Sequence, residues 1–350
     1  MRKKVCVVGA VGVPACYGGF ETLLEYLVES DEVDFTVYCS SMAYATKIPT
    51  YKGASLKYLP LAANGIQSVL YDALSLGGCL FSKPNVVLIL GVSGCFFLPF
   101  FRFFSNAKIV TNIDGLEWRR DKWGGLAKKF LRWSEAIAVK YSDVIISDNK
   151  GIADYVREEY FIDSEIIAYG GDHVLARSPT GKMLGYAFSL CRIEPENNVH
   201  VILDSFSMSS KPLKFVGNWQ ASEYGQTLKK KFSSCPHIEL IEPIYELEKL
   251  FDLRDGCDFY VHGHSAGGTN PSLVEAMFFG KPIIAYDCVY NRSTMEGQGV
   301  YFSDSSSLLE RVSDLAAFGV SNYGAVLCEI AYRRYTWDAV RRDYEEILAN

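Results

Sequence analysis

The chain has 350 residues, of which 49% are apolar and 22% charged, the composition of an ordinary globular protein with ample core. These values exclude a disordered or fibrous chain, and the length favours two domains of about 150 residues each. The formal net charge of −6 argues against a general nucleic-acid-binding protein, so no nucleic-acid partner is expected.

Short apolar runs alternate with helical stretches through the first half of the chain. Near-continuous apolar runs are typical of strands that are buried on both faces of a parallel sheet. The predicted strands cover residues 4–8, 35–39, 86–90, 108–111, 143–146 and 165–168. The predicted helices cover residues 20–29, 66–80, 123–140 and 150–159.

The same alternation returns in the second half, after a glycine-rich stretch of weak periodicity at residues 170–182. Strands are predicted at residues 186–190, 214–216, 238–241, 259–261 and 282–285. Helices are predicted at residues 199–207, 221–232, 246–255 and 272–279. A charged amphipathic helix at residues 337–348 closes the chain, with no strand after it.

Alternating strands and helices imply an α/β fold, and two such series imply two doubly wound, Rossmann-like parallel-sheet domains facing across a cleft. We place the first domain at residues 1–172 and the second at residues 173–325. Residues 326–350 are expected to form helices that pack back on the first domain. Ligands of open α/β sheets bind beyond the carboxyl ends of the strands, so the loops after the strands are the candidate sites.

The loop after the first strand is rich in glycine. Gly9 and Gly12 are three residues apart and therefore do not fit the dinucleotide pattern G-x-G-x-x-G. Gly18 and Gly19 directly precede a predicted helix, where exposed backbone amides and the helix dipole favour an anion such as a diphosphate. The alternative is that these glycines only permit a tight turn.

Two loops of the second domain carry residues suited to a diphosphate. Arg192 follows the first strand of that domain and can form forked hydrogen bonds to phosphate, although a surface ion pair with Glu194 or Glu196 is the alternative. The loop before residues 272–279 is more specific, because bare amides precede a helix that presents Glu275 to ribose hydroxyls or merely to the helix dipole. Its candidate ligand-binding residues are Gly268, Thr269, Asn270, Ser272 and Glu275.

A fourth loop, after the strand at residues 108–111, places Asp114 and Glu117 where a second substrate could bind to the first domain. The alternative for Asp114 is a plain turn before Gly115. No metal site is predicted, because His262 and His264 alternate on one strand without a nearby carboxylate or cysteine.

Cysteine usage and the start of the chain indicate a compartment. The ten cysteines include no C-x-x-C pair, and the chain runs from its first residues straight into a strand without a signal peptide. These features predict a reduced, cytoplasmic protein.

A basic segment follows an aromatic run in the first domain. Residues 102–140 carry nine basic and four acidic side chains, and residues 96–104 are almost all aromatic or apolar. Together they predict reversible peripheral binding to an anionic membrane surface, on the inner face of the plasma membrane. The alternatives are a solvated basic helix and an aromatic run that packs in the core.

These loops resemble those of the retaining glycosyltransferases of family 4, which have the two-Rossmann GT-B fold. The general marks are the Gly-Gly loop with Glu21, Arg192, the run SLVEAM and a closing helix after YTW at residues 335–337. The chain is more similar still to a bacterial subgroup of rhamnosyltransferases that build capsular or cell-wall polysaccharide. The phrases that carry this resemblance are YGGFE (17–21), DGLEW (114–118), RIEPENN (192–198) and GTNPSLVEAM (268–277).

The resemblance implies a metal-independent, anomer-retaining transfer of a sugar, L-rhamnose from dTDP-rhamnose, to a lipid-linked saccharide, with no bound cofactor. It implies that Arg192, Glu275 and Asp114 are catalytic, with Glu117 beside Asp114 on the acceptor side. No D-x-D triplet occurs in the chain, which agrees with a metal-free site.

The chain departs from the wider family at two positions. Gly267 stands where the family usually has the first glutamate of E-x7-E, and Asn198 stands where it usually has a lysine. Two other functions therefore stay open. The chain could be another GT-B enzyme, such as a nucleotide-sugar 2-epimerase, or a catalytically silent partner subunit.

Overall fold

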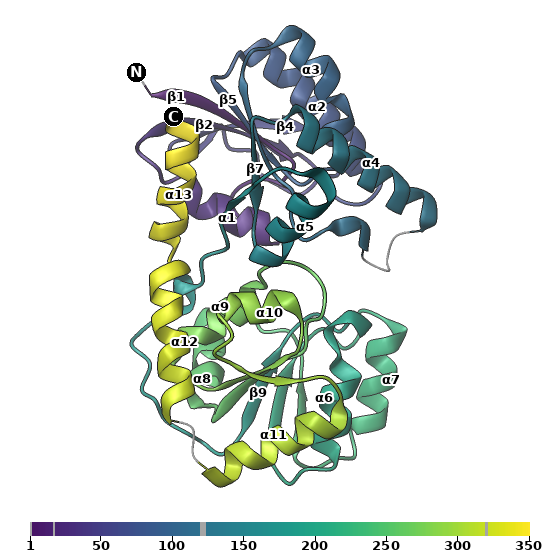
Figure 1. Cartoon of the computed structure of the whole chain (residues 1–350), viewed down its shortest axis with the longest axis vertical. Coiled ribbons are helices and arrows are strands. Elements are labelled where there is room, and N and C mark those ends of the chain that lie inside the picture. Colours follow the sequence, from purple (N-terminus) through teal and green to yellow (C-terminus); the bar gives the residue numbers. More distant parts are fainter. Residues whose placement is uncertain (1, 17, 120–123, 319–320) are drawn as a thin grey trace. The chain divides into compact units, whose positions relative to one another are not determined.

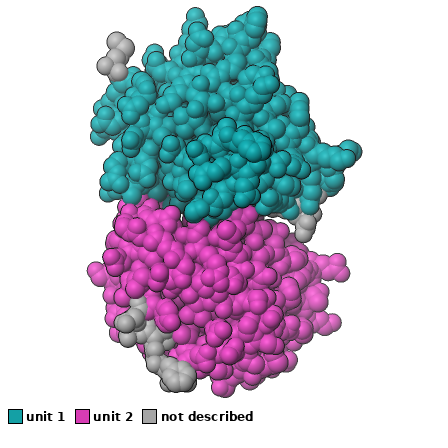
Figure 2. All heavy atoms as spheres, in the orientation of Figure 1, with its two compact units in different colours: residues 1–169, 338–350 teal, residues 170–337 magenta. Residues whose placement is uncertain are grey.

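A computed structural model describes residues 2–16, 18–119, 124–318 and 321–350, with the side chains of residues 316–318 and 321–322 left out. The chain divides into two compact units (Figure 2). Unit 1 comprises Met1–Tyr169 and Asp338–Asn350, and unit 2 comprises Gly170–Trp337.

Unit 1 is built on a sheet whose strand order is β3-β4-β2-β1-β5-β6-β7-β8. All neighbours are parallel except β3 and β4, which pair antiparallel at one edge. The central strand β5 is buried along its whole length, as its unbroken apolar sequence requires. The strands are β1 (Lys3–Val8), β2 (Val33–Ser40), β3 (Thr50–Tyr51), β4 (Ala54–Leu59), β5 (Val86–Leu90), β6 (Lys108–Asn112), β7 (Val144–Ser147) and β8 (Glu165–Ile166).

Helices cover the sheet of unit 1 (Figure 1). The last helix, α13, contacts β6, because the Asn112 amide donates to the buried Tyr344 hydroxyl (2.8 Å) and Lys108 donates to the Ile347 carbonyl (2.8 Å). The helices are α1 (Gly19–Leu27), α2 (Gln67–Ser82), η1 (Cys95–Phe97), α3 (Leu98–Phe104), η2 (Glu117–Arg119), α4 (Gly125–Tyr141), α5 (Lys150–Tyr160) and α13 (Trp337–Ala349).

Unit 2 contains a fully parallel sheet with the strand order β11-β10-β9-β12-β13-β14. This is the doubly wound order in which the chain starts at the centre, moves to one edge and then returns to build the other half. Its strands are β9 (Ala187–Leu190), β10 (Leu213–Val216), β11 (Ile238–Ile241), β12 (Phe259–His262), β13 (Ile283–Tyr286) and β14 (Val300–Phe302).

The helices of unit 2 are η3 (Asp172–Val174), η4 (Pro195–Asn197), α6 (Val199–Ser207), α7 (Glu223–Phe232), α8 (Leu247–Gly256), α9 (Pro271–Met277), α10 (Val289–Thr294), α11 (Ser305–Phe318) and α12 (Ser321–Arg334). Of these, α6, α7 and α11 bury apolar faces in the cluster around the fully buried Trp219 and Phe215.

The predicted fold class of two parallel-sheet α/β domains is confirmed. Every predicted strand and helix overlaps an observed one, whereas β3, β4, β14, α10 and α11 were not predicted. Strand β4 has no continuous apolar run, because its first residues alternate between buried and exposed, as in a strand near a sheet edge.

The limits of the units differ from the expected domain limits. The chain leaves unit 1 after Tyr169 rather than after residue 172, and returns to it after Trp337. Residues 326–337, expected to pack on the first domain, lie in unit 2. The physical reason is that α12 packs on α9 and α10: the Tyr332 ring contacts Phe278 at 5.1 Å, and the Tyr335 hydroxyl donates to the Thr294 carbonyl (2.9 Å).

Candidate functional site

The centre of the unit 2 sheet is a topological switch point. The chain builds outward from β9 through β10 to β11, and on the other side from β12 through β13 to β14. In open α/β sheets a ligand binds beyond the carboxyl ends of the two strands at which the order reverses. The loops after β9 and β12 are the loops in which the sequence places Arg192 and the residues from Gly268 to Glu275.

These two loops are joined to each other. The Asn198 side chain donates to the Gly263 carbonyl (2.9 Å), and the Ser265 amide and hydroxyl both donate to the Glu196 carbonyl (3.1 and 2.8 Å). A Cβ at Gly263 would lie 2.2 Å from the Asn197 carbonyl oxygen, so only glycine permits this approach. Asn198, which replaces the expected lysine, thus links the loops instead of supplying a charge.

Arg192 lies at the start of the first of these loops, and its side chain is 60% exposed. The Asn197 side chain donates to the Arg192 carbonyl (2.8 Å), which fixes its backbone. Its guanidinium lies 3.7 Å from the Glu194 carboxylate, so the ion pair considered from the sequence is present. Because exposed ion pairs contribute little, this pair leaves the guanidinium able to turn toward an anion.

The glycine-rich loop is partly occupied by its own hydrogen bonds. Asn270 caps α9, and its side-chain oxygen accepts from the Ser272 amide (3.1 Å) and hydroxyl (2.8 Å). Thr269 is buried, while Gly268 is partly exposed. Gly267 has φ +99°, a backbone conformation that the glutamate of the wider family would adopt only with strain. To bind a ligand as predicted, the side chains of Asn270 and Ser272 would have to give up the hydrogen bond that they form with each other at the start of α9.

Glu275 is held by two residues that sequence analysis did not single out. On α9, its Oε2 accepts a hydrogen bond from the guanidinium of Arg254, on α8. Its Oε1 lies 3.6 Å from the imidazole Nε2 of His173, on η3. A lone arginine on a charged helix and a histidine near a domain junction carry no sequence pattern that indicates a site.

His173 is itself fixed by the return crossing of the chain. The Trp337 indole donates to His173 Nδ1 (3.0 Å), and the Trp337 amide donates to the Asp172 carboxylate (2.8 Å). Burial lowers the pKa of His173, so its imidazole is neutral at pH 7. Because Nδ1 accepts from an indole, the ring proton is on Nε2, which faces Glu275.

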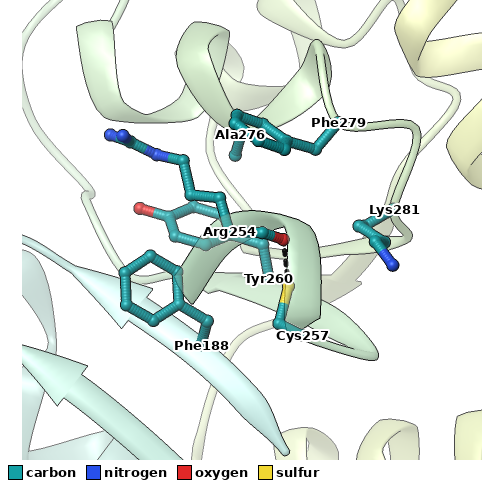
Figure 3. Close-up of a pocket in the computed structure, with 7 residues that line it drawn as sticks. All are labelled: Phe188, Arg254, Cys257, Tyr260, Ala276, Phe279 and Lys281. Atoms are coloured by element: carbon teal, nitrogen blue, oxygen red, sulfur yellow. Dashed lines mark hydrogen bonds between the residues drawn. The ribbon is translucent and has the colours of Figure 1, made fainter. Parts of the chain in front are cut away.

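A narrow cavity lies beside the Arg254 side chain (Figure 3). It has no room for a water molecule. The Cys257 thiol, on its lining, donates to the Arg254 carbonyl (3.1 Å). The lining residues are Phe188, Arg254, Cys257, Tyr260, Ala276, Phe279 and Lys281.

In unit 1, two backbone amides of the glycine-rich loop after β1, where an anion was predicted to bind, already donate to a carboxylate of the protein. Glu21 is buried and accepts from the Gly18 amide (2.8 Å) and the Val11 amide (2.7 Å). Gly18 therefore cannot offer its amide to a phosphate without breaking the bond to Glu21. Gly19 begins α1 beside the ring of Tyr169. Tyr17, the first residue of the phrase YGGFE, lies outside the described residues.

Asp114 and Glu117 lie close together in the loop after β6. Asp114 has φ +61° and its amide donates to the Asn112 side chain (3.0 Å), so the turn considered as the alternative is present. Glu117 begins η2 and is half-buried. The sequence-based acceptor role of both residues stays a prediction.

A buried carboxylate supports this loop from α4. Glu135 accepts from the Trp118 indole (3.1 Å) and from the hydroxyls of Tyr155 (2.7 Å) and Tyr160 (2.8 Å). Burial raises the pKa of Glu135. Three donors on one carboxylate fix the Trp118 ring next to Glu117. Residues 120–123, part of the predicted basic stretch, lie outside the described residues.

Metal ligation finds no support in the side chains of the described residues, which include no group of three or more His, Cys, Asp or Glu that could hold an ion. The His262 and His264 rings are stacked, with centroids 4.5 Å apart and an interplanar angle of 14°, rather than converging on a point. Burial lowers the pKa of His262 to about 3.

Comparisons with known proteins agree with this architecture. Residues 2–172 match a family model described as a domain of unknown function (DUF1972). No curated protein sequence matches the chain. The match to the family model ends before Arg192 and Glu275, so it covers neither of the two loops at the switch point.

Several solved structures are similar over nearly the whole chain. Sucrose-phosphate synthase from Thermosynechococcus elongatus is 13% identical with a TM-score of 0.79, covering 99% of this chain and 98% of its own. HepE from Anabaena, in complex with UDP, is 12% identical with a TM-score of 0.76 and 99% of both chains covered. The catalytic domain of starch synthase IV from Arabidopsis thaliana, bound to ADP and acarbose, is 12% identical with a TM-score of 0.72, again with 99% of both chains covered. The chain thus has the GT-B fold of these proteins, with two parallel-sheet α/β units.

Proposed function

We propose that the protein is a glycosyltransferase that uses a nucleotide-diphosphate sugar. The observation that carries the proposal is the switch point of unit 2, where the loop of Arg192 and the glycine-rich loop of α9 are hydrogen-bonded to each other. This is the position at which doubly wound sheets bind nucleotides. The similar structures that were solved with UDP or ADP support the same class of ligand.

The residues suit the departure of a diphosphate from a sugar. In this proposal Arg192 and the amides around Gly268 stabilise the negative charge that grows on the leaving diphosphate. Glu275 accepts hydrogen bonds from the pentose hydroxyls of the nucleotide. The anomeric configuration is retained because the acceptor hydroxyl attacks on the face from which the diphosphate leaves. The leaving phosphate assists the deprotonation of that hydroxyl. No carboxylate nucleophile is needed in this mechanism.

The finer identity of the substrates rests on the resemblance to the rhamnosyltransferase subgroup. We propose dTDP-rhamnose as the donor and a lipid-linked saccharide as the acceptor, bound near Asp114 and Glu117. Purified protein incubated with dTDP-rhamnose should give a glycosylated lipid only when the acceptor is added. An epimerised nucleotide sugar formed from donor alone would favour a 2-epimerase, and donor binding without turnover across an acceptor panel would favour a silent partner.

Turnover should not require a metal ion. Full activity is expected in excess chelator, because Arg192 and backbone amides supply the positive charge that a cation provides in other transferases. The measurement is the initial rate with EDTA against the rate with added Mg²⁺ or Mn²⁺. An absolute requirement for either ion would contradict a metal-free donor site.

The aromatic run divides between core and surface. Leu98 and Phe101 of α3 are fully buried, whereas Phe100, Phe103 and Phe104 are exposed, so core packing accounts for one face of the helix only. Ring contacts at 5.0, 4.8 and 4.9 Å connect Phe97, Phe100, Phe104 and Phe103 in turn.

Helix α4 packs against α3 and also carries exposed apolar side chains. Leu126 and Trp133 of α4 are exposed, and so are its basic residues Lys129, Arg132 and Lys140. Among the described residues no helix is both long and apolar enough to cross a bilayer. We propose that this face of α3 and α4 lies on an anionic cytoplasmic leaflet, where basic residues contribute about 1 kcal/mol each.

Removing two exposed phenylalanines should release the protein from membranes. Co-sedimentation with liposomes that contain anionic lipid is expected to fall about tenfold or more in the double variant Phe103→Ser/Phe104→Ser, because apolar area no longer leaves water. Wild-type binding should also weaken at high salt and without anionic lipid. Tyr245→Ser, which removes an aromatic ring that is 86% exposed in unit 2, is the matched control. Unchanged sedimentation of the double variant would exclude this face.

A further inference from the structure

Arg254 is a buried cation whose guanidinium contacts the Glu275 carboxylate. Its side chain is 3% exposed, although arginine is almost never fully buried unless it is paired. The guanidinium Nη2 donates to Glu275 Oε2. Its Nε and Nη1 are buried and have no hydrogen-bond partner among the described residues. Within that part of the chain, the Glu275 carboxylate is therefore what holds the guanidinium in place.

The Glu275 carboxylate is in turn held from two sides. Arg254 meets Oε2, and His173 lies 3.6 Å from Oε1 with its ring proton toward it. The Glu275 side chain is 15% exposed, so it is not fully enclosed by these two partners. A charged donor on one oxygen and a neutral imidazole N–H facing the other fix the direction of the remaining lone pairs of this largely buried carboxylate.

We propose that Arg254 is a positioning residue, which holds the Glu275 carboxylate in place and directs it at the pentose hydroxyls of the nucleotide. This inference rests on the proposed function. Arg254 acts through Glu275 and not by contact with the nucleotide, because its side chain is buried and its charged end is directed at the Glu275 carboxylate. The role needs a guanidinium: a lysine ammonium is a compact, strongly hydrated charge without the planar fork, and is less suited to this dry position.

The test measures how strongly the site recognises the pentose hydroxyls. Calorimetric titrations give the Kd of UDP, dTDP and ADP and of their 2′,3′-dideoxy analogues. The quantity compared between variants is the ratio of the Kd of the dideoxy analogue to the Kd of its parent nucleotide. For the nucleotide that binds, the wild-type dideoxy analogue should bind about tenfold more weakly or worse, since a hydrogen bond to a charged group is lost. In Arg254→Lys and Arg254→Met this ratio should fall to within about twofold of one, with dideoxy affinity little changed.

Three variants complete the design. Glu275→Gln should lower the ratio as Arg254→Lys does. The double variant Arg254→Lys/Glu275→Gln should lower it no further, because the two residues act as one unit. Lys211→Met is the matched control, since Lys211 forms a largely buried ion pair with Asp258 in the same unit, before β12 rather than after it. It should lower the melting temperature and leave the ratio at its wild-type value. If Arg254→Met does not fold, Arg254→Lys carries the comparison.

The outcomes separate this inference from the proposed function. A wild-type ratio in Arg254→Lys overturns the positioning role and leaves nucleotide binding intact. A wild-type protein that binds a nucleotide but ignores its hydroxyls overturns the role of Glu275 and, with it, that of Arg254. A wild-type protein that binds none of the nucleotides overturns the proposed function itself.

Discussion

Replacing Arg192 with alanine is expected to lower kcat by about 10²–10³ without loss of stability. The side chain is 60% exposed and lies 3.7 Å from the Glu194 carboxylate, which is itself 38% exposed, so its removal leaves no buried charge behind. The growing charge on the leaving diphosphate would lose a preorganised cationic partner. Steady-state rates and melting temperatures of the same preparations check this.

Glu275 requires a milder variant to give a clean result. Glu275→Ala would leave Arg254 buried without its partner, which costs about 3–5 kcal/mol and would confuse catalysis with unfolding. Glu275→Gln keeps the shape of the side chain and should still reduce turnover by about 10² or more. A normal rate in Arg192→Ala or in Glu275→Gln would remove that residue from the site.

Adding one methyl group at Gly263 should reduce kcat/KM by about 10², because a misplacement of about 1 Å at a site has effects of this size. The new Cβ would lie 2.2 Å from the Asn197 carbonyl oxygen, a backbone atom that cannot rotate away. The loops after β9 and β12 would have to separate, and the Asn198 bond to the Gly263 carbonyl would be lost. Nucleotide affinity should fall in the same variant.

Gly77→Ala is the control for this substitution. Gly77 lies inside α2, and a Cβ there would meet nothing within 4 Å among the described residues. Alanine in a helix interior stabilises by about 0.5–1 kcal/mol relative to glycine, so this variant should melt higher and turn over normally. Wild-type kcat/KM in Gly263→Ala would mean that the joined loops are not part of the working site.

The sequence predicts the central strands of both sheets because burial on both faces of a sheet requires a continuous apolar run, which is a local sequence pattern. Strands such as β5 and β12 are short, nearly continuous apolar runs, and β12 is followed by a loop whose residue types indicate its chemistry. Strand β4, next to the edge strand β3, alternates between buried and exposed residues, and strand β14 is only three residues long, so both lack that pattern.

The loops themselves were also predictable, but their internal bonds were not. Glycines before a helix indicate available amides, yet the sequence does not reveal that Glu21 occupies the Gly18 amide or that Asn270 caps α9 with Ser272. In both cases a side chain of the loop bonds to the loop's own amide. Such competition depends on backbone angles that only the folded chain defines.

By itself the sequence determined that this protein has two doubly wound series and that Arg192 and Glu275 follow strands of the second. The tertiary structure alone decided that β9 and β12 are neighbours, that their loops are joined, and that Arg254 and His173 hold Glu275. The physical reason is distance along the chain. Periodicity and turn chemistry are local, whereas Arg254 and His173 meet Glu275 only because packing brings together helices that the sequence separates.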